Sequence, residues 1–256
     1  MLQAWLHALP YLLGAGFLTW LLSVRLRNVA IVDTLWSLMF VLAACVYASA
    51  SMPLGPRAQL LLALVSIWGL RLAFYLGVRT YGHEEDRRYQ HIRRRNDPGF
   101  AWKSLYLVFG LQAALAWIIS LPLLGGIVGD NAPLGLLDYA GAALWLVGFY
   151  FEAIGDWQLA RFKADPANAG RVMDRGLWGL TRHPNYFGDF CVWWGFGLIA
   201  LAAGAWWSLI GPVLMSVLLL RVSGVTLLER DIGMRRPGYE EYIRRTNAFF
   251  PGPRRK

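Results

Sequence analysis

The stretch GLWGLTRHPNYFGDFCVWWGFGLIALAAGAWW, residues 176–207, joins a dense polar cluster to an aromatic, apolar run. The polar half gathers five side chains within eight residues: Arg182, His183, Asn185, Tyr186 and Asp189. Pro184 cannot continue a helix that arrives from its N-terminal side, but it suits the first position of a new helix. The stretch therefore predicts a membrane helix whose start offers free N–H groups to an anion. A plain helix start with an interfacial Arg–Asp pair is the simpler alternative.

The composition of the whole chain indicates an all-α membrane protein. Of the 256 residues, 57% are hydrophobic, and the mean hydropathy is +0.40. Several apolar runs approach the roughly 20 residues that a helix needs to cross a bilayer. Cys45 and Cys191 lie inside such runs, so neither a disulfide framework nor a metal site is expected. We expect one polytopic membrane domain, residues 1–256, without a bound metal.

Seven segments are expected to cross the membrane. They lie at about 5–24, 29–50, 58–78, 102–124, 136–160, 186–203 and 206–228. The first segment follows no basic region and has no small-residue cleavage site, so we expect it to be retained and not removed as a signal peptide. The charged segment 81–99, YGHEEDRRYQHIRRRNDPG, cannot span and is expected to form an exposed helix or loop at the membrane surface.

The distribution of charge sets the expected orientation. Basic residues gather after the first, third and fifth segments and in the C-terminal tail, whereas the loops after the second, fourth and sixth hold only Arg57. Because basic loops stay in the cytosol, the N-terminus is expected outside and the C-terminus in the cytosol. The same rule explains the net charge of +9 without nucleic acid as a partner.

Several polar side chains meet on the cytosolic side in this topology. Glu152 and Asp156 lie four residues apart and share a helix face. Since like charges at this spacing repel, they are expected to hold a shared donor, such as ribose hydroxyls or an arginine. Four basic side chains suit phosphate groups: Lys163, Arg171, Arg182 and Arg245. Plain positive-inside charge is the alternative, and it is weakest for Arg182.

A second polar group lies at membrane depth in the first three segments. Asp33 and Arg71 are ionisable residues within apolar runs, and such residues normally face the bundle interior, where they pair or serve a site. Tyr75 follows Arg71 by four residues on the same face. An acid and a phenol can polarise a ketone oxygen, provided that the acid is protonated. A structural Asp33–Arg71 bridge is the alternative.

Several segments together resemble a known family. The stretches GLWGLTRHPNYFGDFCVWWG (176–195), LLERD (227–231) and RRPGYEEYIRRTNAFFP (235–251) are similar to the C-terminal domain of the steroid 5α-reductase (3-oxo-5-alpha-steroid 4-dehydrogenase) family. The stretches NVAIVDTLW (28–36), WGLRLAFYLGVR (68–79) and GHEEDRRY (82–89) resemble its bacterial branch, long described as a domain of unknown function. The resemblance covers nearly the whole chain.

The resemblance implies a seven-helix membrane reductase that binds NADPH and transfers a hydride to the C=C bond of an enone lipid. The half at 136–256 would bind the cofactor, and the half at 1–125 the substrate. With Lys163, the expected cofactor-binding residues are Glu152, Asp156, Arg182, His183, Asn185, Tyr186, Asp189, Glu229, Tyr242 and Arg245. Asp33 would match the acid that, with a tyrosine, hydrogen-bonds the substrate ketone. Trp68 lies near the family's position for that tyrosine, so Tyr75 is the substitute candidate.

Two other functions stay open. Isoprenylcysteine carboxyl methyltransferases and phospholipid methyltransferases share the Arg-His-Pro-x-Tyr stretch, which would place S-adenosylmethionine in the same cytosolic pocket. A non-catalytic lipid-binding membrane protein is the other. In every case the expected partners are membrane lipids and a hydrophobic small molecule or lipid. Likeness to the bacterial branch indicates a bacterial inner membrane.

Overall fold

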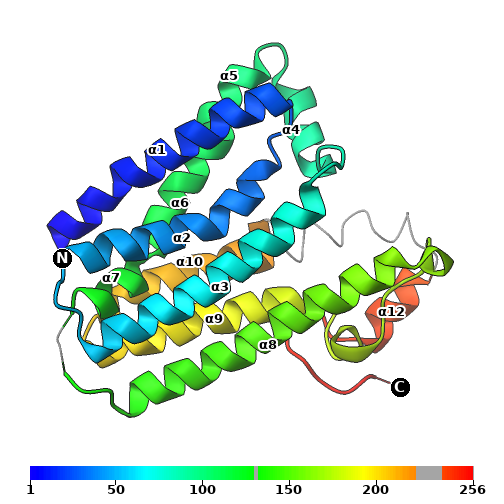
Figure 1. The fold of residues 1–256 in the computed structure, drawn as a ribbon. Coiled ribbons are helices and arrows are strands. Elements are labelled where there is room, and N and C mark those ends of the chain that lie inside the picture. Colours follow the sequence, from blue (N-terminus) through cyan, green and yellow to red (C-terminus); the bar gives the residue numbers. More distant parts are fainter. Residues whose placement is uncertain (130–131, 223–237, 256) are drawn as a thin grey trace. The chain divides into compact units, whose positions relative to one another are not determined.

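The computed structural model describes residues 1–129, 132–222 and 238–255. This part of the chain contains helices and irregular segments but no strand, which confirms the all-α prediction (Figure 1). Five helical segments are long and apolar enough to cross a membrane: α1 (Leu2–Leu26), α2 (Ile31–Ser49), α3 (Pro56–Thr80), Phe100–Ile119 and α8 (Leu136–Ala164). The protein is therefore an integral membrane protein.

The last two predicted segments are also helical. The segment predicted at 186–203 is α9 (Pro184–Ala202). The one predicted at 206–228 contains η4 (Trp206–Leu209), α10 (Ile210–Val217) and the π-helical turn η5 (Leu218–Val222), while residues 223–228 lie outside the described residues. The first turn of α9 is polar, and the Trp206–Val222 run is short, so neither joins the five candidate spans. Seven spans stay a prediction.

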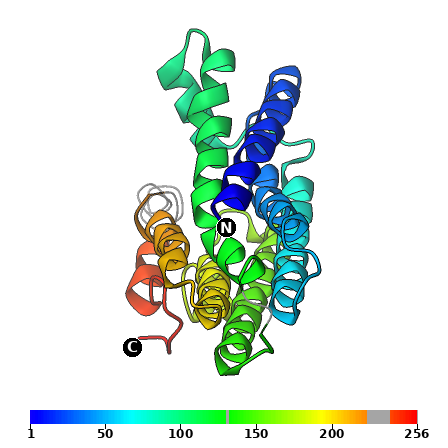
Figure 2. The same ribbon diagram turned by 90° about the vertical axis from the view of Figure 1, so that its left-hand side faces the viewer.

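The chain divides into two compact units. Unit 1 comprises Met1–Gly135 and Ile199–Ile210, and unit 2 comprises Leu136–Leu198 and Gly211–Lys256. Within unit 1, α2 packs against both α1 and α3, while α6 (Leu111–Ile119) packs against α1 and α2 (Figures 1 and 2). Gly69 of α3 comes so close to α2 that a Cβ atom there would lie 3.0 Å from the Ser37 carbonyl oxygen. This close approach brings the middle of α3 against the first half of α2.

The fourth predicted segment, 102–124, is shorter than expected. It contains α5 (Phe100–Ser104), the π-helical turn η1 (Leu105–Gly110) and α6, which ends at Ile119. A separate buried helix, α7 (Leu121–Ile127), follows with Pro122 in its first turn. Proline lacks the N–H that a continuous helix needs. The Ser120 hydroxyl lies at this break and bonds both the Trp117 carbonyl and the Tyr47 hydroxyl.

The charged segment between the third and fourth spans contains a helix, α4 (Arg87–Asn96). Its residue Tyr89 belongs to a buried cluster with Trp20 of α1, Val29 just before α2, and Phe100 at the start of α5. Burial of this aromatic ring attaches a strongly polar helix to the bundle of unit 1. Of the two predicted forms, an exposed helix or a loop, the structure shows a helix, and Tyr89 of this helix is buried.

In unit 2, α8 and α9 lie against each other along glycines (Figure 1). A Cβ atom on Gly148 would lie 2.5 Å from the Gly188 carbonyl oxygen and 2.6 Å from the Val192 nitrogen. Small residues let two membrane helices approach this closely. Beyond them, the chain forms η2 (Pro166–Asn168), η3 (Gly176–Gly179) and, after the undescribed residues, α12 (Tyr239–Arg245).

Candidate functional site

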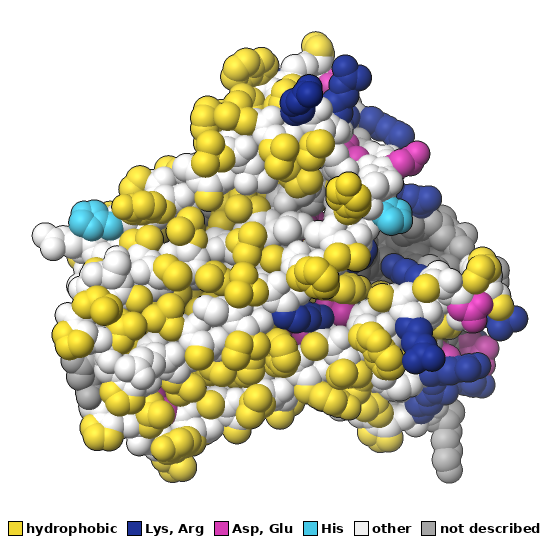
Figure 3. Space-filling model, in the orientation of Figure 1, with side chains coloured by type: hydrophobic (Ala, Val, Ile, Leu, Met, Phe, Trp, Pro, Cys, Tyr) yellow, Lys and Arg dark blue, Asp and Glu magenta, His cyan; other side chains and the backbone are white. Residues whose placement is uncertain are grey.

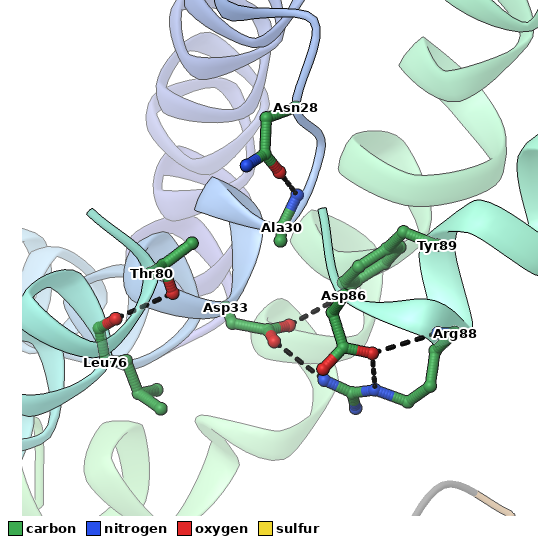
Figure 4. A network of polar contacts seen from close by, with 8 residues as sticks. All are labelled: Asn28, Ala30, Asp33, Leu76, Thr80, Asp86, Arg88 and Tyr89. Atoms are coloured by element: carbon green, nitrogen blue, oxygen red, sulfur yellow. Dashed lines mark hydrogen bonds and ion pairs between the residues drawn. The ribbon is translucent and has the colours of Figure 1, made fainter. Parts of the chain in front are cut away.

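Asp33 lies in the first turn of α2, where two side chains of α4 hold it (Figure 4). Its Oδ2 atom accepts a hydrogen bond from Arg88 Nη2 at 2.8 Å. Its Oδ1 atom accepts a hydrogen bond from the Tyr89 hydroxyl at 2.5 Å. Because both carboxyl oxygens accept, one of them from a guanidinium, the geometry is that of a carboxylate and not of a protonated acid.

Two acids before α4 set the position of this helix. Asp86 is the N-cap, and its Oδ1 atom accepts from the Arg88 backbone N–H at 2.9 Å and from Arg88 Nε at 3.0 Å. Glu85 accepts from Arg93 Nε and Nη2 at 2.9 and 2.8 Å. Glu85 also accepts from the Val29 backbone N–H at 2.9 Å, immediately before α2. The acids thus anchor α4 through Arg88 and Arg93, and Glu85 also anchors the residues just before α2.

Burial and charge shift the proton affinities of the α4 residues. The pKa of Tyr89 is raised well above 10.0 because the phenol is buried and faces the Asp33 charge. For Arg88, burial lowers the pKa, but Asp33 and Asp86 outweigh it and raise the pKa overall. The phenol therefore keeps its proton, and the guanidinium keeps its charge, at any physiological pH.

The structure pairs Asp33 with α4 and not with Arg71, the alternative that the sequence offered. Among the described residues, its polar partners are Arg88 and Tyr89, and neither Tyr75 nor Arg71 is one of them. The guanidinium carbons of Arg71 and Arg79 instead lie 5.5 and 5.8 Å from the centre of the Tyr75 ring. The alternative of a structural Asp33–Arg71 bridge is therefore wrong. A catalytic role for Tyr75 itself stays a prediction.

Sequence reasoning missed Arg88 and Tyr89, although a signal was present. Asp86 followed by a short run with Tyr89 and Ile92 three residues apart is the pattern of a capped helix with one apolar stripe. Tyr89 is the buried residue of this helix. Because Tyr89 lies on the inner face of α4, its hydroxyl reaches Asp33 in the first turn of α2.

In unit 2, the predicted residues of α8 and α9 lie near one another. Asn185 Nδ2 donates to Asp156 Oδ1 at 3.3 Å, and both Asp156 and Glu152 are buried. The stacked rings of His183 and Tyr186 lie 5.6 Å apart. Glu152 and Asp156 of α8 thus lie close to the start of α9, because α8 and α9 approach each other closely at their glycines.

Arg182 holds the C-terminal tail. Its Nη1 atom donates to the carbonyl oxygens of Thr246 and Ile243 at 2.6 and 3.1 Å, and its backbone N–H donates to the Asn247 carbonyl at 2.9 Å. Tyr242 adds a bond from its hydroxyl to the Trp178 carbonyl at 2.5 Å. Burial raises the pKa of Tyr242, so this donor stays protonated. Arg182 therefore anchors the tail, and its predicted binding of phosphate stays a prediction.

A cavity of about 260 Å³ lies beside this anchored tail. Three arginines line it, each from a different segment: Arg171, Arg245 and Arg254. Arg245 also pairs with Glu241 at 2.6 Å, and Arg254 with Asp174 at 3.4 Å. Guanidinium groups converging on a cavity suit phosphate oxygens.

The remaining predicted residues are more scattered. Lys163 is exposed in the last turn of α8, and Asp189 is half-buried in α9. Glu229 lies outside the described residues. No group of three or more His, Cys, Asp or Glu side chains in the described residues is suited to a metal ion.

Comparison with known proteins places the chain in a family. The model of a family described as "Protein of unknown function (DUF1295)" matches residues 19–246. The chain belongs to the DUF1295 family. It is also similar to the uncharacterized protein C594.04c of Schizosaccharomyces pombe (strain 972 / ATCC 24843), with 24% identity over 275 residues that cover 92% of this chain and 76% of the relative. No solved structure matches the chain.

This DUF1295 member thus carries two kinds of polar arrangement. In unit 1, the carboxyl group of Asp33 accepts hydrogen bonds from the Tyr89 hydroxyl and the Arg88 guanidinium. A proton donor, Tyr89, thus lies beside the Asp33–Arg88 ion pair. In unit 2, arginines surround a cavity next to a tail that side chains clamp in place. The first arrangement suits polarisation of a neutral oxygen, and the second suits an anion.

Proposed function

We propose that the protein is a membrane-embedded reductase that uses NADPH to reduce the C=C bond of an enone lipid, a steroid or another isoprenoid. The observation that carries the proposal is the Tyr89 hydroxyl, 2.5 Å from the carboxylate of Asp33. The resemblance to steroid 5α-reductases implies an acid of the second helix acting with a tyrosine. Tyr89 supplies that phenol where Tyr75 was expected.

The proposed chemistry follows from the proton of Tyr89 and the charges of Asp33 and Arg88. Tyr89 keeps its proton because its pKa is raised, first by burial and then by the Asp33 charge. When a ketone replaces Asp33 as the acceptor, Tyr89 polarises it, which makes the β-carbon electrophilic and stabilises the negative charge that develops on oxygen. Arg88 stays bonded to Asp33 and compensates the carboxylate that loses the phenol.

The residues of unit 2 fit a dinucleotide. NADPH, when bound, supplies the hydride. Arg245, with Arg171 and Arg254 around the same cavity, has the donors to bind phosphates. Glu152 and Asp156 have acceptors for sugar hydroxyls, and Asn185 orients Asp156 through its amide. Arg182 keeps the tail in position beside them.

The proposal also includes the number of membrane spans, their orientation and the membrane that holds the protein. Seven helices would span the membrane, with the N-terminus outside and the basic loops and tail in the cytosol, where NADPH is available. A bacterial inner membrane is the proposed location. A dry, apolar cavity would admit the lipid substrate from the bilayer and keep water from the reaction.

Ligand-dependent thermal unfolding of the detergent-solubilised full chain tests the proposal. A ligand that binds the folded state alone raises the unfolding temperature, so NADPH is expected to do so and S-adenosylmethionine is not. Enone-dependent oxidation of NADPH, followed by absorbance with a panel of 3-oxo-4-ene steroids and isoprenoid enones, then tests the reaction. Stabilisation by S-adenosylmethionine instead would indicate a methyltransferase. Stabilisation by neither ligand would indicate a non-catalytic lipid-binding protein.

A further inference from the structure

Both faces of α4 carry arginines, but only those of the inner face pair with acids. On the inner face, Arg88 and Arg93 each pair with an acid at 2.8 Å. On the outer face, the exposed basic side chains follow a helical spacing of four, three and one residues: Arg87, His91, Arg94 and Arg95. These positions share one side of the helix, and Tyr89 lies on the other side. We call these four residues the outer stripe.

The arginines of the outer stripe have no acidic partner among the described residues. Of the acids near α4, Asp86 and Asp33 bind Arg88 and Glu85 binds Arg93, while the exposed Glu84 and Asp97 form no ion pair with the outer stripe. Three exposed guanidinium groups therefore lie on a helix of 10 residues without an ion pair to any acid in the described part of the chain. Figure 3 shows Lys and Arg side chains gathered over the end of unit 1 where α4 and α5 lie.

The position of α4 in unit 1 indicates what faces the stripe. The helix lies in the chain between two candidate spans, one ending at Thr80 and the next beginning at Phe100. Trp102 and Tyr106, at the start of the latter span, are 71% and 62% exposed. Exposed Trp and Tyr at a span end are typical of the headgroup level of a bilayer. The stripe thus lies close to lipid headgroups.

We infer that the outer stripe of α4 is a binding site for anionic lipid headgroups, such as those of phosphatidylglycerol or cardiolipin. Guanidinium groups bind phosphate through paired hydrogen bonds, and a basic amphipathic helix beside a membrane binds anionic lipids. Because Arg88, Tyr89 and Arg93 tie the inner face to unit 1, bound lipid would hold α4 from its other side. This inference does not depend on the proposed reductase activity.

The test measures lipid-dependent thermal stabilisation of the full chain in a neutral detergent. Short-chain phosphatidylglycerol is titrated, with phosphatidylcholine of the same acyl chains and inorganic phosphate in parallel. We expect phosphatidylglycerol alone to raise the unfolding temperature, and this rise to shrink as salt screens the charges. A triple variant, R87Q/R94Q/R95Q, should bind phosphatidylglycerol on the order of 100-fold more weakly, because each basic residue near an anionic surface contributes several-fold.

Two matched variants separate a site from general charge. R161Q/R175Q/R244Q removes the same charge from exposed arginines of unit 2 and should keep the wild-type response. R87K/R94K/R95K keeps the charge and should retain most of the binding. The inference is overturned if the unit 2 variant loses binding equally, or if phosphatidylcholine or inorganic phosphate stabilises the protein as well as phosphatidylglycerol does. If the glutamine variant does not fold, a salt-independent response of the wild type overturns it instead.

Discussion

The polar cluster around Asp33 and the one around Arg182 differ in what their charged groups touch. Asp33 binds other side chains, a phenol and a guanidinium. Arg182 donates to backbone carbonyls of the tail, which cannot exchange places with a ligand without moving the chain. The difference teaches that the first cluster is suited to chemistry, whereas the contacts of Arg182 first of all hold structure. The predictions below test this division.

The largest expected effect is on turnover at the Asp33 cluster. In the proposed reductase, Tyr89→Phe should lower kcat by about 100- to 1,000-fold, as expected for loss of a donor to a developing oxyanion. NADPH affinity should not change, because the phenol lies in unit 1 and binds Asp33. The measurement is enone-dependent NADPH oxidation together with NADPH-dependent thermal stabilisation. Tyr75→Phe is the matched control and should stay near wild type, and equal losses in the two variants would contradict the assignment.

The next effect is on stability at the Arg182 cluster. Arg182→Ala should lower the free energy of unfolding by about 2–3 kcal/mol, because two carbonyls lose a charged donor in a buried position. Tail release should be visible as faster limited proteolysis after α12. Arg245→Ala is the comparison, since this exposed side chain pairs only with Glu241 among the contacts described. It should cost less than about 0.5 kcal/mol in stability and instead weaken NADPH binding. Reversed effects would mean that Arg182 binds the phosphate and Arg245 holds the tail.

The sequence predicted the fold better than the site, and the reason is physical. Helix positions follow from apolar length and from local breakers such as Pro184, so all seven predicted segments contain helix where they are described. The partner of Asp33 depends instead on how a 10-residue polar helix folds back over the bundle. Residue spacing along α3 favoured Tyr75, but spacing within one helix says nothing about a neighbour that arrives from a loop. The contacts of Arg182 with backbone carbonyls leave no side-chain pattern in the sequence either.

A smaller effect tests the packing that brings the predicted unit 2 residues together. Gly148→Ala should lower the free energy of unfolding by about 1–3 kcal/mol, because its methyl group would overlap the Gly188 carbonyl and Val192 nitrogen. Gly14→Ala is the matched control in α1, where an added Cβ atom meets nothing within 4 Å. It should leave stability unchanged or raise it by up to about 1 kcal/mol. Thermal or denaturant unfolding in detergent measures both, and similar losses would argue against close α8–α9 packing.

The smallest effect concerns acid stability of the helix that carries Tyr89. Burial raises the pKa of Asp86, but the charge of Arg88 and its hydrogen bonds outweigh burial and lower the pKa below the ordinary 3.8. A carboxyl group with a lower pKa in the folded state stabilises that state above its unfolded pKa, and this contribution disappears as pH falls from about 3.8 through the folded value.

Asp86→Asn keeps an N-cap acceptor but loses the charge. We expect it to weaken hydrogen-exchange protection of α4 by less than about 1 kcal/mol at neutral pH, and wild type and variant to converge in acid. Asp33 and Glu85 also face α4, so the quantity to compare is the difference between the two proteins at each pH. A difference that grows as pH falls would show that the Asp86 charge does not stabilise α4.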